Sequence, residues 1–168
     1  NAWARLERAE IDIEAFDSLF AGEAARAGHA LRGRDVLAVI AGRIRPEMVA
    51  ALDRLAAAGY RLGCITNNMN AGSNRGMAHA AASDFAAVMA RFEHVVESAK
   101  AGVRKPDPRI YALMCDALGL PPEACVYLDD LGINCKPAAA LGMHAIKVTG
   151  AAQALDDLEA VLGLPLRD

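Results

Sequence analysis

Three groups of polar side chains in this 168-residue sequence have the chemistry of a phosphate site. Thr66 and Asn67 follow an apolar run, Lys105 lies in a loop that contains two prolines, and Asp129 and Asp130 directly follow the apolar run CVYL. A hydroxyl and an ammonium group are donors for phosphate oxygens, and paired carboxylates suit Mg²⁺, which prefers hard oxygen ligands. The combination predicts a site for a phosphate group and Mg²⁺.

Each group taken alone has a simpler interpretation. A Thr-Asn pair after a strand is often a turn or a helix cap, and a lysine before a proline is often a solvated loop residue. A pair of aspartates after a strand is often a cap and a surface charge. The prediction therefore depends on whether all three groups lie at the same edge of one sheet.

The elements around these residues favour such an edge. From Pro46 onward, helical and strand-like patterns alternate along the chain, which indicates a parallel sheet with helices on both faces. Ligands of such sheets bind beyond the carboxyl ends of the strands. Strands are expected at 61–66, 92–98, 124–130 and 144–150, and helices at 46–58, 78–91, 107–118, 134–142 and 152–162.

The first 42 residues differ from the rest because apolar residues recur at helical spacing throughout them. We therefore predict two units, a partial helical unit over 1–42 and an α/β core over 43–168. The Asn- and Gly-rich segment 67–77 has the composition of a loop, and we expect it to be mobile near the mouth of the site.

Composition restricts the partners of the chain. The net charge is −3 and no basic run is present, so nucleic acid is not an expected partner. No apolar run approaches the roughly 20 residues of a membrane span, and no export signal is present at the start, so we expect a cytoplasmic protein. The four cysteines show no CxxC spacing and read as reduced thiols, and the four scattered histidines do not suggest a zinc site.

Three stretches resemble motifs II, III and IV of the haloacid dehalogenase-like (HAD) hydrolase superfamily. They are CITNN, GVRKPDPRIY and VYLDDLGINCKPAAALGM, and residues 46–150 fit the family in order and spacing. The nearest resemblance is to the subgroup of the N-terminal phosphatase domain of soluble epoxide hydrolase and the HAD domains fused to some acyl-CoA dehydrogenases. The resemblance implies a Rossmann-like α/β core, with residues 1–42 as the remnant of a small helical cap inserted after motif I.

The resemblance also implies roles for the residues of motifs II and III. Thr66 would donate a hydrogen bond to the transferring phosphoryl group, and Asn67 would lie beside it. Lys105 would hold the phosphate group and the nucleophilic aspartate together. Thr66 and Lys105 are thus the expected catalytic residues, and the expected substrate is a small phosphorylated molecule.

Motif IV would supply the cation site. Asp130 is the expected direct ligand of Mg²⁺. Asp129 would belong to the same site without binding the ion directly. Asn134 would line the phosphate or cap side. Without a cation, two adjacent carboxylates repel one another, so Mg²⁺ would account for the paired charges.

The nucleophilic aspartate itself is not found. In phosphatases of the family it lies in a DxDx(T/V) string at the end of the central strand, and the nearest string here, Asp12-Ile13-Glu14, follows a charged helical segment. The segment with motif I, and with it the first, central strand of the sheet, would lie before Asn1. Strands 61–66 and 125–129 would then have unpaired edges, unless they pair directly, another chain supplies a strand, or the true N-terminus lies outside this sequence.

Four functions remain in view. The first is a Mg²⁺-dependent phosphohydrolase, and the second is an inactive HAD-like scaffold that binds a ligand or partner, with a homodimer covering the open edge. A 2-haloacid dehalogenase is weaker, because the paired acids favour phosphate chemistry. A receiver-like signalling domain is disfavoured, because its acid pair would come early in the chain.

Overall fold

A computed structural model describes residues 1–39, 43–67 and 79–167. The predicted loop 67–77 and the predicted unit boundary at 42 therefore fall largely outside the described residues. The helices are α1 (Ala2–Glu7), α2 (Ile13–Arg26), α3 (Gly33–Val39), α4 (Pro46–Ala57), α5 (His79–Met89), α6 (Ser98–Ala101), α7 (Pro108–Leu118), the 3₁₀ turn η2 (Pro122–Ala124), α8 (Gly132–Ala140) and α9 (Ala151–Leu162). The strands are β1 (Gly63–Thr66), β2 (His94–Glu97), β3 (Val126–Asp129) and β4 (His144–Lys147).

Local sequence explains where the longer core helices begin and end. Pro46 opens α4 at a position whose N–H has no helical partner, with Glu47 in the first turn. Asp107 caps α7, its side chain accepting a hydrogen bond from the Arg109 N–H. Gly119 then ends α7 with a left-handed backbone, φ 60°, which glycine adopts without steric cost.

Two parts of the predicted chain course are wrong. Residues 98–101 form α6 instead of strand end and loop, and Gly102 ends this single turn with φ 68°. The first helix ends at Glu7 rather than running past residue 10, because Ala9 takes a positive φ of 56°. Both differences lie where the helical unit meets the core.

The four strands form two parallel pairs instead of one continuous sheet. β1 pairs with β2 from Gly63 opposite His94 to Thr66 opposite Glu97, and β3 pairs with β4 in the same parallel sense. Within the described ranges, β1 and β3 are not hydrogen-bonded to each other. Direct pairing of these two strands is therefore excluded for the described chain. Each of them keeps one edge without a strand partner among the described residues.

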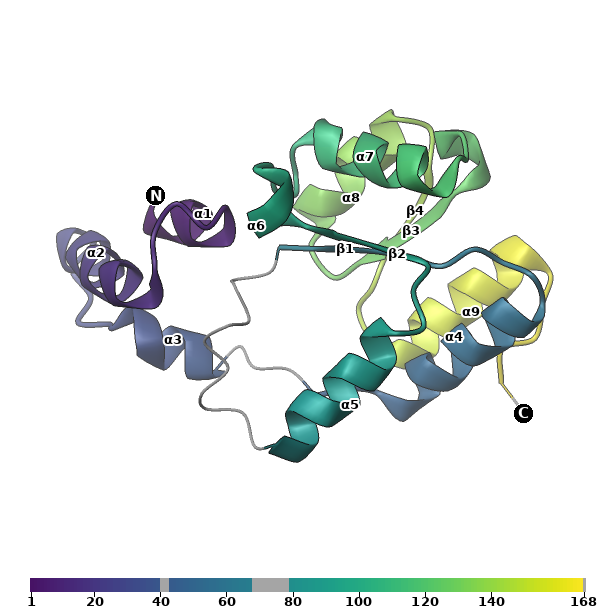
Figure 1. Cartoon of the computed structure of the whole chain (residues 1–168), viewed down its shortest axis with the longest axis horizontal. Helices are drawn as coiled ribbons and strands as arrows, with labels where there is room; N and C mark the ends of the chain where they lie inside the picture. The colour runs from purple at the N-terminus through teal and green to yellow at the C-terminus, as the bar shows by residue number, and fades with distance from the viewer. Residues whose placement is uncertain (40–42, 68–78, 168) are drawn as a thin grey trace.

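Helices cover the strands on both faces, and those of one face join the two pairs. Figure 1 shows α7 and α8 on one side of the strands and α4 and α9 on the other. Side chains of β3 alternate between the faces, so Tyr127 packs with the α7–α8 cluster while Val126 and Leu128 pack with the α4–α9 cluster. β1 also reaches the α7–α8 cluster, through Ile65. The α7–α8 cluster thus contacts both pairs, whereas the strand residues of the α4–α9 cluster come from β3 and β4.

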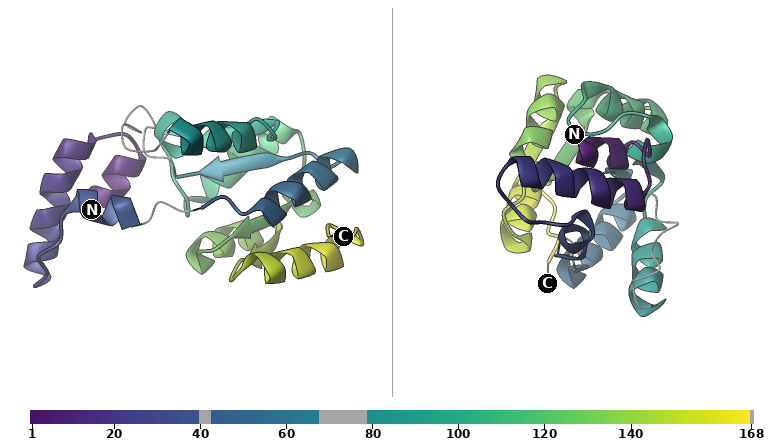
Figure 2. Two further views of the ribbon diagram at one scale, coloured as in Figure 1. Left: turned by 90° about the horizontal axis from the view of Figure 1, so that it is seen from below. Right: turned by 90° about the vertical axis from the view of Figure 1, so that its left-hand side faces the viewer.

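The helices α1 to α3 pack around a cluster of their own at one end of the molecule (Figures 1 and 2). Phe16 is fully buried there, and the Trp3 ring meets it edge-on at 5.5 Å. The buried Ser98 Oγ donates a 2.5 Å hydrogen bond to the carbonyl oxygen of Glu7 and so ties α1 to α6 of the core. None of the helices that the structure describes is long and apolar enough to cross a membrane.

Candidate active site

Asp129, the last residue of β3, is the centre of a buried polar network. Its Oδ2 accepts hydrogen bonds from Lys105 Nζ at 2.8 Å and from the Tyr127 hydroxyl at 2.6 Å. Its Oδ1 accepts from the Leu131 N–H and from Asn134 Nδ2, both at 2.9 Å. Four donors therefore surround one carboxylate that is only 8% exposed.

The donors decide the charge of this carboxylate. Burial alone raises the pKa of Asp129, but the hydrogen bonds from Lys105, Tyr127, Leu131 and Asn134 outweigh burial and leave the pKa below its usual value. Asp129 is therefore ionised at neutral pH. Burial and the bond to this carboxylate raise the pKa of Tyr127, so the phenol stays protonated as a donor.

The position of Lys105 is set by Asn67, the residue after β1. Asn67 Oδ1 accepts from the Lys105 N–H at 2.8 Å, and Asn67 Nδ2 donates to the Lys105 carbonyl at 3.1 Å. The end of β1 thereby holds the backbone of the loop between α6 and α7. The Lys105 ammonium is directed at Asp129, and its side chain is 14% exposed.

Asn134 lies in the first turn of α8 and is 4% exposed. Besides its amide bond to Asp129, its backbone carbonyl accepts a 2.8 Å hydrogen bond from Tyr111, a fully buried residue of α7. The structure thus brings Asn67, Lys105, Asp129 and Asn134 into one continuous set of contacts.

Thr66 and Asp130 occupy the same strand ends but lie outside this network. Thr66 is the last residue of β1 and is partly exposed, and Asp130 directly follows β3 and is exposed. No hydrogen bond or ion pair joins either side chain to the network within the described ranges. Asp130 is therefore the carboxylate of the pair that is accessible to a ligand.

Sequence reasoning missed the two tyrosines of this network. Tyr127 precedes Asp129 by two residues, so both side chains lie on the same face of β3. That spacing was available in the sequence. The bond from Tyr111 to the Asn134 carbonyl joins residues 23 positions apart, and no local pattern indicates it.

The donor set suits Mg²⁺ only in part. Among the residues described, no group of three or more His, Cys, Asp and Glu side chains could enclose a metal ion. The two oxygens of Asp129 already accept four protein donors, which leaves little capacity for a cation. The exposed Asp130 carboxylate fits an ion that takes one or two carboxylates and completes its shell with water and phosphate oxygens.

Comparison with known proteins places this chain in a family. The family model of haloacid dehalogenase-like hydrolases matches residues 3–142. The chain therefore belongs to the haloacid dehalogenase-like hydrolases, and the resemblance seen in its sequence is confirmed.

Individual relatives include proteins of the subgroup that the sequence indicated. The chain is 40% identical over 121 residues to acyl-CoA dehydrogenase family member 10 of Mus musculus, covering 72% of this chain and 11% of that protein. It is 36% identical over 125 residues to bifunctional epoxide hydrolase 2 of Sus scrofa, covering 74% and 22%. It is 32% identical over 112 residues to phosphatase MT3486 of Mycobacterium tuberculosis, covering 66% and 49%. The chain thus spans less than half of the length of each of these relatives.

Solved structures confirm the α/β fold. A HAD-like family hydrolase from Porphyromonas gingivalis superposes with a TM-score of 0.72 over 96% of this chain and 78% of that chain, at 22% identity. A HAD family enzyme from Bacteroides thetaiotaomicron in complex with magnesium and inorganic phosphate superposes with a TM-score of 0.59 over 88% and 74%, at 18% identity. At these identities the likeness concerns the fold alone.

Proposed function

We propose that this chain forms the phosphate and Mg²⁺ site of a phosphohydrolase acting on a small phosphorylated substrate. The observation that carries the proposal is the ion pair between Lys105 and the buried Asp129, with the exposed Asp130 beside it at the end of β3. The phosphatase among the relatives and the magnesium and phosphate complex among the structural neighbours support it.

Each residue has a chemical task in this proposal. Lys105 would neutralise charge on the phosphate oxygens, and Asn67 would keep its loop in place. The Thr66 hydroxyl would donate to the phosphoryl group. Asp130 would hold Mg²⁺, which when bound stabilises negative charge on a phosphoryl group. Asp129 would hold the Lys105 ammonium, and Asn134 would hold Asp129 on the cap side.

Hydrolysis by this route also needs an aspartate nucleophile, and the sequence contains no DxDx(T/V) string. We propose that this aspartate belongs to a further strand between β1 and β3. The support is that each of these strands pairs on one side only within the described chain, while the α7–α8 cluster packs against both pairs. The 168 residues alone would then bind phosphate without hydrolysing esters.

A second candidate function is a binding scaffold without catalysis. The unpaired edges of β1 and β3 favour it, because exposed strand edges recruit further strands. In that case a homodimer would cover the edges. A 2-haloacid dehalogenase would need the same aspartate, and the phosphatase among the relatives gives it no support.

Phosphate affinity measured with and without Mg²⁺ tests the proposed site without requiring turnover. Calorimetric titration with inorganic phosphate should show tighter binding in Mg²⁺ for the natural chain, and Asp130→Asn should abolish this gain. The matched control Asp116→Asn removes an exposed acid on α7 and should retain it. Equal affinity with and without Mg²⁺ in the natural chain would refute the cation site.

A further inference from the structure

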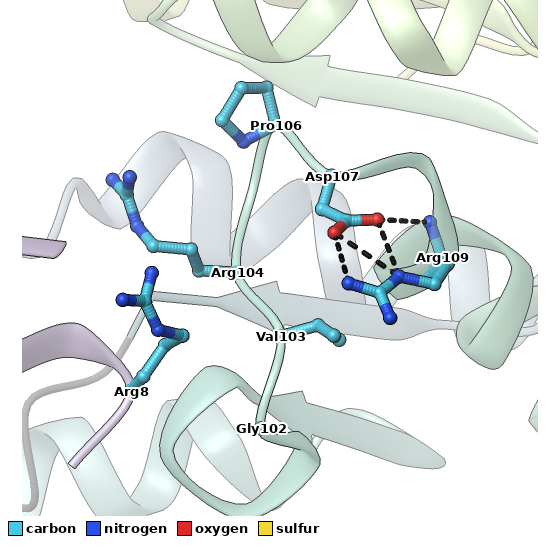
Figure 3. Close-up of a pocket in the computed structure, with 7 residues that line it drawn as sticks. All are labelled: Arg8, Gly102, Val103, Arg104, Pro106, Asp107 and Arg109. Carbon is cyan, nitrogen blue, oxygen red and sulfur yellow. Dashed lines mark hydrogen bonds and ion pairs between the residues drawn. The ribbon is translucent and has the colours of Figure 1, made fainter. Parts of the chain in front are cut away.

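A polar cavity lies between the end of α1 and the loop that joins α6 to α7 (Figure 3). Its volume is about 360 Å³, which lies within the range of about 300–1,000 Å³ typical of small-molecule sites. Three of the side chains along it are arginines. The lining residues are Arg8, Gly102, Val103, Arg104, Pro106, Asp107 and Arg109.

The three arginines are not equivalent. Figure 3 shows Arg109 turned toward Asp107 on one side of the loop, where its Nε and Nη2 donate to the carboxylate at 2.6 to 3.2 Å. Arg8 and Arg104 lie on the other side of the loop, away from Arg109, and both line the cavity. Each of the three arginines has a carboxylate partner, but Arg109 engages Asp107 through two nitrogens, whereas Arg8 and Arg104 each engage theirs through one. The pair Arg8–Arg104 therefore keeps more free donors for a ligand.

Many donors of this pair have no protein acceptor in the described chain. A guanidinium carries five N–H groups. Arg8 uses Nε for a 2.6 Å bond to Glu10, and Arg104 places Nη2 2.5 Å from Glu7 Oε2. That ion pair lacks hydrogen-bond geometry, because Glu7 Oε2 and Arg104 Nε are buried without a hydrogen-bond partner among the described residues. A buried N–H of a charged group without an acceptor is costly, so the present pairing of Arg104 is not an optimal one.

We propose that Arg8 and Arg104 bind a phosphate-class dianion, either free or as the second phosphate of a larger ligand. Two guanidinium forks match a tetrahedral oxyanion, because each can donate two parallel hydrogen bonds to a pair of oxygens. Glu10 and Glu7 each pair with one of these arginines, so an incoming dianion would bind through the guanidinium N–H groups that the two carboxylates leave free. The site belongs jointly to the helical unit, through Arg8, and to the core, through Arg104.

The new site adjoins the candidate active site through a short chain of contacts. Arg104 directly precedes Lys105 and pairs with Glu7. Lys105 is in turn held by Asn67, which bonds to both backbone polar groups of Lys105. A ligand with two phosphates would therefore meet cations at both places. This bridging form rests on the proposed function, whereas binding of a free anion does not.

The test uses inorganic phosphate and calorimetric titration of the whole chain. The variants are Arg8→Gln, Lys105→Gln and the double variant, with Arg26→Gln as a control that removes an exposed arginine from the last turn of α2. Arg8 is suited to substitution because it lies at the end of α1 with a side chain 31% exposed. Circular dichroism verifies the fold of each variant. Arg8→Lys tests whether a positive charge without the guanidinium group is enough to bind phosphate.

Lys105→Gln should still bind phosphate at the new site. The double variant should bind it roughly tenfold more weakly or worse, which is the effect expected for the loss of charged hydrogen bonds. Arg26→Gln should match the natural chain, and Arg8→Lys should fall between the natural chain and Arg8→Gln. Equal phosphate affinity in Lys105→Gln and in the double variant would overturn the new site. Loss at Arg8→Gln without any change at Lys105→Gln would instead overturn the proposed function and leave the new site standing.

A bisphosphate of propanediol separates the two sources of the anion. If one molecule bridges both sites, it binds with a stoichiometry of one, and Arg8→Gln and Lys105→Gln each weaken that single event. If the new site takes free anions, two molecules bind and each variant removes one. Insensitivity of both inorganic phosphate and the bisphosphate to Arg8→Gln contradicts the site in either form.

Discussion

The residue that organises the candidate active site is Asp129, although sequence reasoning placed more chemistry on its neighbour. Four donors converge on its buried carboxylate, and together they hold its pKa below the usual value. Asp130, one position further, is exposed and is not part of that network. The paired carboxylates thus divide their tasks. One fixes Lys105, and the other is open to a cation.

The first prediction concerns the pH dependence that Asp129 gives to stability. Because its pKa is lower in the folded chain than in the unfolded chain, its contribution is fully present above about pH 4 and is lost as pH falls further. Asp129→Asn should lower the free energy of unfolding by about 3 kcal/mol at pH 7, because it leaves Lys105 without its charged partner. The difference in the free energy of unfolding between Asp129→Asn and the natural chain should become smaller below about pH 4. Urea denaturation across pH measures both.

The control for this variant is Asp53→Asn, which breaks a 2.7 Å ion pair with Arg91 on the surface. Exposed pairs contribute little to stability, so its effect should be far smaller. Equal losses in the two variants, or a constant loss at Asp129 across acid pH, would contradict the role assigned to the buried carboxylate.

The second prediction concerns the hydroxyl of Tyr127. Tyr127→Phe keeps the edge-on ring contact with Tyr111, at 5.2 Å between centroids, and removes only the bond to Asp129. We expect a loss of about 1.5–3 kcal/mol in the free energy of unfolding, the usual range for a hydrogen bond to a charged group. The pKa of Asp129, followed by NMR, should rise. An unchanged pKa would show that Tyr127 does not help to keep this carboxylate ionised.

At the scale of elements, the two parallel strand pairs are the feature that needs explanation. Burial of unpaired backbone groups is costly, yet β1 and β3 share the core cluster beneath α7 and α8 without being hydrogen-bonded to each other. The proposed further strand would lie between β1 and β3, where each has an edge without a strand partner in the described chain. This arrangement underlies the proposal that the nucleophile comes from such a strand.

The third prediction is an alternating pattern of amide exchange in β1 and β3. Successive N–H groups of a strand point to opposite sides, so every second amide should be bonded to β2 or β4 and should exchange slowly. The intervening amides should exchange fast in dilute solution. Hydrogen exchange followed by NMR measures this at each residue. Uniformly slow exchange at low protein concentration would mean that the edges are already covered.

Raising the protein concentration distinguishes the scaffold candidate. If a homodimer covers the edges, the fast amides of β1 and β3 should become protected as the dimer forms. Concentration-independent exchange would exclude that form of the scaffold.

At the scale of the whole molecule, α1 joins the helical unit to the core beside the site. Glu7 provides both contacts, its carbonyl to Ser98 and its carboxylate to Arg104. Burial raises the pKa of Glu7, although Arg104 opposes the rise. The helical unit is thereby placed directly against the loop of Lys105.

The fourth prediction is that Ser98→Ala loosens this attachment. The Ser98 side chain is fully buried, and its loss leaves the Glu7 carbonyl without this donor, at a cost of about 1–3 kcal/mol. The hydrogen-exchange rates of the amides in α1 should increase more than those of the amides in α7. Ser18→Ala is the matched control, because the exposed Ser18 hydroxyl bonds the Glu14 carbonyl within its own helix. Similar effects of both variants would show that the Ser98 bond does not attach α1.

Much of this architecture could be predicted from the sequence because it is local. The stripe and caps of α7 and the apolar run before Asp129 are readable within a few residues of one another. The parallel sense of the strands follows from the helices between them. The sequence also places Asn67, Lys105 and Asp129 at the same edge, where the structure brings them into contact.

What could not be predicted depends on contacts between distant segments. Nothing near Tyr111 indicates that its hydroxyl meets the Asn134 carbonyl, and nothing near Arg8 indicates that it lies beside Arg104. The separation of the strands into two pairs could not be predicted either. The alternation of helices and strands along the chain indicates that the strands are parallel, but it does not indicate which strands are neighbours. The single turn of α6 is too short to produce a periodic signal.

The measurement that tests the account most directly is hydrolysis of p-nitrophenyl phosphate with and without Mg²⁺. It compares the 168-residue chain with a folded version fused to a preceding strand that ends in DxDx(T/V), and with Asp130→Asn in that version. The account predicts no turnover by the chain alone and Mg²⁺-dependent turnover by the fused form, lost in Asp130→Asn. Mg²⁺-dependent turnover by the chain alone, or a folded fused form without activity, would contradict it.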